Sequence, residues 1–413
     1  MLSPYRVLDL TTERGLLCGQ VLGDLGADVI KIEPPGGSPA RQLGPFYHDQ
    51  PHPDRSLYWW AHNRNKRGIT LDIHTPEGAA LLKRLVASAH FFIESENPGV
   101  LAEAGFGYAD LAAMNPALVV VSITPFGQDG PKAHYAESDL IILAASGPLV
   151  LTGDDDRAPV RVSVPQGYAH ASAQAAVAAL VAHHERQRSG RGQHVDVSAQ
   201  QATAQATQSG ILAAPLGERE FLRLAGGVKM GPVVVRLVWP AKDGYVSIGF
   251  LFGSAMAHFT RRLMEWVHEE GFCDAATRDK DWVAMGALFF GAPEMIAEYE
   301  RLCTIVESFS RSKTKDELLQ AALQRGLLIA PLLTLDEVRA SEQLAARDYW
   351  QALEHPELGH AVRYPGPFGK FSVSPIRYRR RPPTVGEHNR EMYVDELGLT
   401  EAQVSELQRK GVV

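Results

Sequence analysis

The side chains that could most readily take part in acid–base catalysis lie along an alanine-rich stretch in the middle of the chain. Tyr168 and His170 stand at its beginning, and His183 and His184 stand near its end. A lone histidine among small residues can act as a general base near neutral pH, although it is more often a packed residue with one satisfied hydrogen bond. Adjacent histidines point to different helix faces, so His183 and His184 followed by Glu185 favour a solvated helix end over a metal site.

Carboxylates, which covalent catalysis on an acyl group would need, are missing from the beginning of this stretch. The segment 164–170 reads Val-Pro-Gln-Gly-Tyr-Ala-His and contains neither Asp nor Glu. No aspartate occurs between Arg157 and Asp196. The three aspartates at 154–156 follow a Thr-Gly pair and are typical of a solvated turn.

Short apolar runs alternate with amphipathic stretches and must position these residues. Strands are expected at 5–10, 28–33, 68–73, 117–123 and 194–197, and helices at 16–25, from Thr75-Pro76 onward and at 169–184. This alternation predicts an α/β fold with a doubly wound parallel sheet and right-handed crossovers. The runs 233–238 and 244–248 predict an antiparallel pair of strands in a smaller α+β domain.

We therefore expect three parts in the chain. Residues 1–224 form the N-terminal part of a large nucleotide-binding-like domain, and 225–330 form a small α+β domain. Residues 331–413 form a linker and a C-terminal return to the large domain, because their extended Pro- and Gly-rich pieces cannot make a core of their own. A length of 413 residues, too long for one ordinary core, agrees with this division.

Composition excludes several classes of function. Hydrophobic residues make up 45% and charged residues 22% of the chain, as in globular proteins. The formal net charge of −7 argues against a nucleic-acid binder, and the three cysteines have unrelated spacings that suit neither disulfides nor a metal cluster. We find no signal-peptide layout and no apolar run near the roughly 20 residues that span a bilayer. A cytoplasmic protein without nucleic-acid, membrane or metal sites is expected.

Seven short strings, in order along nearly the whole chain, resemble signatures of CoA-transferase family III, the CaiB/BaiF group that includes formyl-CoA transferase and α-methylacyl-CoA racemase. Each string is weak alone, and their common order makes the resemblance specific. They are GADVIKIE at 26–33, NRNKR at 63–67, NP at 115–116 with FGQDGP at 126–131, SGRGQHVDVS at 189–198, HPELG at 355–359, GEHNR at 386–390 and GVV at 411–413.

The resemblance implies a large domain made from both ends of the chain, a small middle domain, and two subunits threaded through each other like linked rings. Such threading would make the dimer obligate, since neither subunit could leave without unfolding. The resemblance also implies CoA thioesters as substrates and no covalently bound cofactor. In the family, an aspartate attacks the acyl-CoA thioester to give a mixed anhydride, which the released CoA thiolate converts into an aspartyl thioester.

The position of that aspartate, about twenty residues before the Gly-Arg-Gly-Gln loop, falls on Tyr168, or on Gly167 with a shift of one residue. The acid–base pair of the racemases is absent as well, because its histidine aligns with Ser138 and its aspartate is the one already missing. Asp139, beside Ser138, is expected to begin a helix. We therefore expect no catalytic residue in this chain, with His170 as the substitute to consider.

Positions that contact CoA in the family are altered too. The aligned residues here are Pro34, Ser95, Glu96 and Glu103. Replacing arginines by a proline and an acid removes attraction for phosphate or adds repulsion. Lys66 and Arg67 survive, either as CoA contacts or as residues that support the fold at a strand entrance. The CoA of the complex is accordingly expected to bind mainly to a partner subunit.

These features lead to the hypothesis of a non-catalytic, structural subunit beside a homologous catalytic CoA-transferase subunit, in an interlocked heterodimer or a larger heteromer. Within the family, the chain most resembles the nucleophile-free subunit of a two-chain type that moves CoA between succinyl-CoA and (R)-benzylsuccinate in aromatic degradation. One alternative is a homodimeric acyl-CoA lyase, hydratase or isomerase that uses His170 or Tyr168. Another is a non-enzymatic scaffold that kept the fold for assembly.

Overall fold

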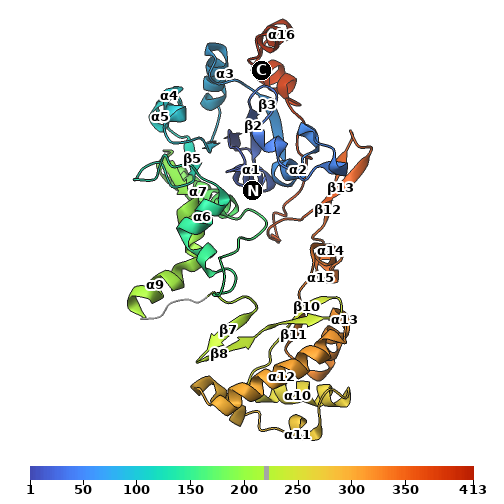
Figure 1. The fold of residues 1–413 in the computed structure, drawn as a ribbon. Coiled ribbons are helices and arrows are strands. Elements are labelled where there is room, and N and C mark those ends of the chain that lie inside the picture. The colour runs from blue at the N-terminus through green and yellow to red at the C-terminus, as the bar shows by residue number, and fades with distance from the viewer. Residues whose placement is uncertain (218–222) are drawn as a thin grey trace. The chain divides into compact units, whose positions relative to one another are not determined.

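The computed structural model describes residues 1–217 and 223–413, which fall into two compact units (Figure 1). Unit 1 comprises 1–149, 161–218 and 343–413, and unit 2 comprises 150–160 and 219–342. Compared with the expected boundaries, 150–160 and 331–342 lie with the smaller unit. Both ends of the chain belong to unit 1. Among the described helices, none combines the length and apolar character that crossing a bilayer requires.

A six-stranded parallel sheet forms the centre of unit 1, with the strand order β3-β2-β1-β4-β5-β6, so the predicted doubly wound sheet is confirmed. The strands are β1 Arg6–Asp9, β2 Asp28–Glu33, β3 Lys66–Thr70, β4 Phe91–Glu94, β5 Val119–Thr124 and β6 His194–Ser198. The strand order reverses between β1 and β4, because the chain runs outward to β3 and then returns to the middle. β3 begins at Lys66 rather than at the expected Gly68, because its buried charged side chains mask the apolar pattern of a strand.

Helices cover both faces of this sheet. α1 and α7 pack on one face around Cys18, Ala175 and Val121, and α3 packs on the other around Leu82 and Val120. The helices of unit 1 are α1 Leu16–Asp24, α2 Leu57–Asn63, α3 Pro76–Ala87, α4 Val100–Glu103, α5 Tyr108–Met114, α6 Asp139–Ser146, α7 Gly167–Ser189, α8 Ala199–Ala204, α9 Gln208–Leu216 and α16 Glu401–Arg409. Short 3-10 turns occupy Pro39–Gln42, Tyr47–Asp49, Pro53–Arg55, Pro148–Leu151 and Gln205–Thr207, and a π-helical turn occupies Glu391–Glu396.

Local sequence explains where the main helices begin and end. The Thr75 hydroxyl accepts the Gly78 amide (3.1 Å) and caps α3, whose first residue is Pro76, as the sequence predicted. α7 ends at Gly190, which has the left-handed conformation (φ 74°) that glycine adopts without strain. The small side chains of α7 allow it to lie close to α1 and the sheet.

The C-terminal segment covers the β3 edge of the sheet. The Tyr393 hydroxyl donates to the Thr70 carbonyl (2.6 Å), and the Asp72 amide donates to the Val412 carbonyl (2.7 Å). Lys410, just past α16, pairs with Glu77 on α3 (3.1 Å), and Figure 1 shows the red C-terminal helix near the blue α3. Before this segment, β12 Gln351–His355 and β13 His360–Tyr364 form an antiparallel hairpin.

Unit 2 is a small α+β unit with an aromatic core that includes Trp239, Phe250 and Trp282. Its strands and helices are β7 Gly227–Met230, β8 Val233–Arg236, β9 Val238–Ala241, β10 Gly244–Ile248, β11 Ile329–Pro331, α10 Ala257–Glu269, α11 Ala275–Arg278, α12 Pro293–Arg311, α13 Lys315–Arg325 and α14 Leu335–Arg339, with a 3-10 segment at Ala284–Phe290 and α15 Glu342–Ala346 at the boundary with unit 1. The predicted pairing of 233–238 with 244–248 holds only at its end, where Val238 pairs with Ser247; β10 pairs mainly with the rest of β9, and residues 233–236 form β8, which pairs with β7. An apolar run carries no mark of where one strand ends and the next begins.

Arg186 on α7 is buried near the amino ends of the strands, and none of its acceptors in the described part of the chain is a carboxylate. Its guanidinium donates to the His90 carbonyl (2.5 Å) and to His183 Nδ1 (2.5 Å). His183 is buried and His184 is exposed, so the two lie on different helix faces as predicted. The expectation of a solvated helix end is wrong for His183, which serves as the acceptor for Arg186. Among the described residues, no group of three or more His, Cys, Asp or Glu could hold a metal ion.

We predict that this cluster makes the fold sensitive to mild acid. Burial, and then the Arg186 charge, lower the pKa of both His90 and His183 below the ordinary value of 6.5. Below that pH the folded state binds fewer protons than the unfolded state, so the free energy of unfolding declines as the pH falls and is unaffected by these groups at higher pH. Denaturant midpoints measured between about pH 7.5 and 5.5 should show this decline.

The variant His183→Gln keeps an acceptor for Arg186 but cannot titrate, so its midpoint should decline less steeply than that of the unmodified chain. The matched control is His134→Gln, at an exposed position, which should leave the slope unchanged. Equal slopes for all three proteins would contradict the assignment.

Candidate functional site

A cleft opens at the carboxyl ends of the strands in unit 1, where the strand order reverses between β1 and β4. Parallel α/β sheets bind their ligands at this place, because the loops on either side diverge there. The cleft has a volume of about 360 Å³ and is lined by the loops that follow β1, β2, β3 and β4 and by the start of α4.

The lining of the cleft carries acidic and neutral side chains. Glu33, Asp72 and Glu96 contribute to it, and no described Lys or Arg does. Pro34 and Glu96, two of the altered CoA positions, both line the cleft. The others do not: Ser95 is buried, where its Oγ accepts the Thr12 amide (2.8 Å), and Glu103 is exposed at the end of α4.

Lys66, the first residue of β3, is fully buried and does not line the cleft. Its ammonium group donates to Asp9 Oδ2 (2.8 Å), to the Leu16 carbonyl (2.8 Å) and to Asn63 Oδ1 (2.9 Å). Three acceptors use all three of its N–H groups, which leaves none for a phosphate. Burial, opposed by Asp9, lowers the pKa of Lys66 to about 8.

Asp9 is the centre of this buried network, because Lys31 also donates to it (Oδ1, 3.2 Å). Burial alone would raise the pKa of Asp9, but the charges of Lys31 and Lys66 hold it below its ordinary value. The network joins β1, β2 and β3, which run side by side from the middle of the sheet to one edge.

Arg67 is placed away from the cleft. Its guanidinium pairs with Asp28 at the amino end of β2 (2.6 Å) and with Glu391 (2.9 Å) and Glu396 (2.5 Å) of the C-terminal segment. The structure therefore puts the two surviving cations in different ion networks and brings neither to the cleft.

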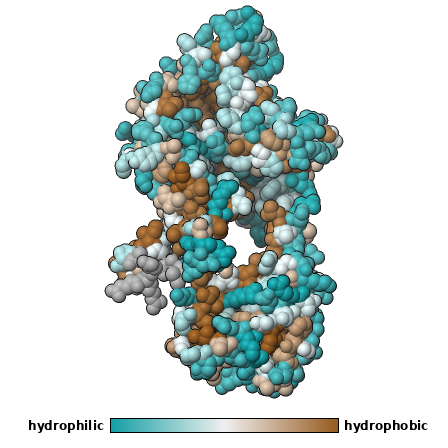
Figure 2. Space-filling model, in the orientation of Figure 1, coloured by the Kyte–Doolittle hydropathy of each residue, from teal (hydrophilic) through white to brown (hydrophobic). Residues whose placement is uncertain are grey.

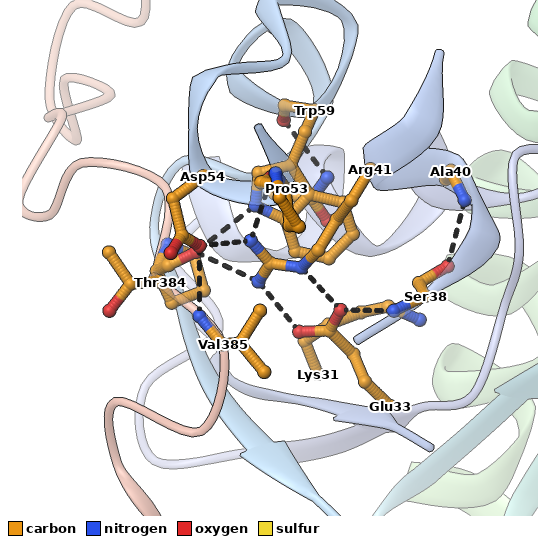
Figure 3. A network of polar contacts seen from close by, with 12 residues as sticks. Lys31, Glu33, Ser38, Ala40, Arg41, Pro53, Asp54, Trp59, Thr384 and Val385 are labelled. Carbon is orange, nitrogen blue, oxygen red and sulfur yellow. Dashed lines mark hydrogen bonds and ion pairs between the residues drawn. The ribbon is translucent and has the colours of Figure 1, made fainter. Parts of the chain in front are cut away.

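Arg41 follows β2 and is the centre of a buried polar network that includes the lining residue Glu33 (Figure 3). Its buried guanidinium binds both oxygens of Glu33 (Nε–Oε2 2.6 Å, Nη2–Oε1 2.8 Å) and also Asp54 (2.8 Å). It lies 3.8 Å from the ring centroid of Trp59 and donates to the Pro383 carbonyl (3.0 Å). Glu33, a lining residue, is thereby neutralised.

We predict that Arg41→Met lowers the free energy of unfolding by about 3–5 kcal/mol, because it leaves the buried Glu33 without a counter-charge. Urea unfolding would measure the change. The matched control in the same unit is Arg390→Met, which breaks exposed ion pairs with Asp395 and Glu401 and should cost less than about 1 kcal/mol. Equal losses in both variants would contradict a structural role for the buried network.

The N-terminus of α7, where we expect the family's aspartate position, is capped by a carboxylate from another element. Asp139 Oδ1 accepts hydrogen bonds from the backbone N–H groups of Gln166 (2.7 Å) and Gly167 (2.8 Å). Asp139 is the first residue of α6, as predicted, and Ser138 caps that helix. Two of the backbone amides at this helix end are therefore already engaged.

Tyr168 faces an ion pair formed by two loops. Arg14, after β1, pairs with Glu137, before α6 (3.1 Å), and also donates to Asn97 Oδ1 (2.8 Å). Burial, and then the nearby Glu137 carboxylate, raise the pKa of Tyr168, so its phenol stays protonated at neutral pH. His170 is exposed one turn into α7, and none of its described side-chain contacts joins it to this group.

Sequence reasoning missed Arg14 and Glu137. They are far apart along the chain, and they meet because the carboxyl ends of β1 and β5 lie at the same edge of the sheet. The carboxyl ends of the strands in a parallel sheet all lie at one edge, and this rule could have predicted that the loops carrying Arg14 and Glu137 lie close together.

A smaller pocket of about 110 Å³ was missed as well, and it includes Glu94, Ser122 and His194. Burial raises the pKa of Glu94 to about 7, and Ser122 Oγ lies 2.9 Å from His194 Nε2.

A family model, that of CoA-transferase family III, matches residues 2–389. Among named relatives, subunit BbsE of succinyl-CoA:(R)-benzylsuccinate CoA-transferase from Thauera aromatica is 33% identical over 415 residues, covering 100% of this chain and 98% of the relative. Succinyl-CoA–D-citramalate CoA-transferase from Chloroflexus aurantiacus is also 33% identical over 415 residues, with the same coverage. Among solved structures, a CaiB/BaiF family protein from Brucella suis is similar with a TM-score of 0.79 and 27% identity, covering 95% of this chain and 98% of that one.

Proposed function

The chain belongs to CoA-transferase family III, and from this premise we propose that it is the non-catalytic subunit of a heteromeric CoA-transferase whose homologous partner performs the chemistry. The names of its relatives describe the transfer of CoA between an acyl-CoA and a carboxylic acid. The role of this particular chain depends on the residues it places at the family's catalytic position.

The observation that carries the proposal is the N-terminus of α7. The family reaction needs a free carboxylate there, because only an acyl carboxylate anhydride is reactive enough to take the CoA thiolate back. This chain presents Gly167 and Tyr168 instead. A protonated phenol is a poor nucleophile, and the ester it would form is a different and less activated intermediate than an anhydride.

Two carboxylates do lie close to this position, and both are engaged. Asp139 accepts the amides of Gln166 and Gly167 and holds the start of α7. Glu137 pairs with Arg14 at 3.1 Å, which lowers the electron density available for attack on a thioester. Neither therefore replaces the missing aspartate in this proposal.

The charge of the cleft supports binding of CoA by the partner. The three phosphates of CoA need cations or free amide groups. In the described part of the chain, no Lys or Arg lines the cleft, while Asp72 and Glu96 do. We assign Lys66 and Arg67 to support of the fold, because each is satisfied by internal carboxylates.

An apolar surface on unit 1 is suited to a partner subunit. Val177 and Val181 on α7 are 62% and 64% exposed and border a groove of about 500 Å³ beside β6. Further exposed apolar residues lie on α6 and α9, namely Leu140, Ile141, Ile211, Leu212 and Leu216. Figure 2 shows brown, apolar surface where Figure 1 places these helices. Such a surface on one face of a protein marks an interaction site, and we propose that a homologous chain covers it in an interlocked heteromer.

We propose succinyl-CoA as the CoA donor of the complex, because both 33%-identical relatives carry succinyl-CoA in their names. For the acceptor we propose (R)-benzylsuccinate, and hence a role in degradation of aromatic compounds. We choose this acceptor because the relative whose name includes (R)-benzylsuccinate is also the one named as a subunit. A subunit of a larger enzyme matches the nucleophile-free role proposed for this chain.

One prediction of the proposed function concerns activity. The full-length chain purified alone should give no transfer of CoA from succinyl-CoA to (R)-benzylsuccinate and no covalent CoA adduct in its intact mass, because it lacks the carboxylate nucleophile. Native mass spectrometry of the complex from its host should show equal numbers of this chain and a homologous chain that has Asp at the position of Gly167 or Tyr168. Co-expression of the two should give activity.

Variants separate this role from the alternatives. In the reconstituted complex, Tyr168→Phe and His170→Ala should leave turnover unchanged, as should Glu137→Gln if the complex still assembles. Transfer at enzymatic rates by the chain alone would reject the proposal. In that event, loss of activity in Glu137→Gln or in His170→Ala would identify the replacement group.

The second prediction concerns assembly. The double variant Val177→Glu with Val181→Glu should reduce the fraction of chain found in the heteromer after co-expression, because two unpaired carboxylates would be buried against the partner. Thermal unfolding of the chain alone should not change, since both side chains are exposed in it. The control Leu323→Glu, at a 71% exposed position of unit 2, should assemble normally. Full assembly of the double variant would exclude this face as the interface.

A further inference from the structure

The cleft at the reversal of strand order has apolar walls. Leu10, Ile32, Leu71, Ile73 and Leu101 line it, from the ends of β1, β2 and β3 and from α4. Its volume of about 360 Å³ falls within the range of roughly 300–1,000 Å³ found for small-molecule sites. Walls of this kind suit a ring or another compact apolar body.

The polar groups of the cleft are mainly acceptors. Asp72 and Glu96 both line it, and neither forms an ion pair with a described Lys or Arg. Glu33 is different, because Arg41 neutralises it. A ligand would therefore meet two carboxylates whose charge is not balanced by the chain.

Three backbone amides around the cleft are engaged within the chain. The Thr11 amide donates to Asp9 Oδ1 (3.0 Å), and the Thr12 amide donates to Ser95 Oγ (2.8 Å). On the opposite wall, the Ser38 amide donates to Glu33 Oε2 (2.8 Å). An anion entering the cleft would meet no Lys or Arg among the described lining residues, and it would be repelled by Asp72 and Glu96.

We propose that this cleft binds a small ring compound without negative charge that carries hydroxyl or amino donors, such as an unphosphorylated nucleoside. The apolar walls hold the ring, and the Asp72 and Glu96 carboxylates accept its donors. The same two carboxylates exclude the phosphorylated forms. The inference goes beyond the proposed function, which gives this chain no small-molecule ligand of its own.

The test is a comparison of adenosine with ADP. The two probes share the same ring and sugar, but adenosine is uncharged and ADP carries negatively charged phosphates. Isothermal titration calorimetry on the full-length chain, in the assembly in which it purifies, should show adenosine binding at least about tenfold more tightly than ADP in about 0.1 M salt. Ile73→Trp, which fills the cleft, should abolish the adenosine signal and so assign it to this chain. Leu323→Trp, on an exposed position of unit 2, should not.

A second variant tests the role of charge without filling the cleft. Glu96→Lys should raise the affinity for ADP at least about tenfold, because it replaces a repulsive group by an attractive one. The proposal is overturned if wild-type chain binds ADP as tightly as adenosine, if it binds no adenosine, or if Ile73→Trp binds adenosine unchanged. Failure here leaves the subunit assignment intact, since that assignment is decided by CoA transfer of the isolated chain.

Discussion

A buried guanidinium group holds together parts of unit 1 that are far apart along the chain. Arg41 has no access to water, so each of its N–H groups must find an acceptor inside the protein. It takes them from Glu33 at the end of β2, from Asp54, and from the Pro383 carbonyl (Figure 3). Because the last acceptor belongs to the C-terminal segment, Arg41 ties that segment to the loop that follows β2.

The same principle explains why no described Lys or Arg lines the cleft. Burying a charge is costly unless it is paired, and in this chain the pairs are made internally. Lys66 pairs with Asp9, Arg67 pairs with Asp28, and Arg14 pairs with Glu137. Each pairing stabilises the sheet edge or its loops, and each removes a cation that a phosphate could have bound. What remains at the cleft is apolar surface with unbalanced carboxylates.

Helix α7 has two apolar faces. One face of the helix is packed with alanines against α1 and the sheet, and another face exposes Val177 and Val181. A helix that is apolar on opposite faces is usually covered on both. The helix therefore has one face packed inside unit 1 and another that exposes valines, and its first turn carries Gly167 and Tyr168.

The sequence by itself determined the sheet, most of its strands, the capped helices α3 and α6, and the absence of an aspartate at the start of α7, because these depend on local pattern and on residue identity. It did not separate β8 from β9, since an apolar run has no internal boundary. It left Lys66 and Arg67 open between binding and support. Only the tertiary structure decided their surroundings, because the partners of a buried charge come from distant segments: Asp9 and Asn63 for Lys66, Glu391 and Glu396 for Arg67. The physical reason is that pairing of charges depends on distance in space, which a one-dimensional pattern does not contain.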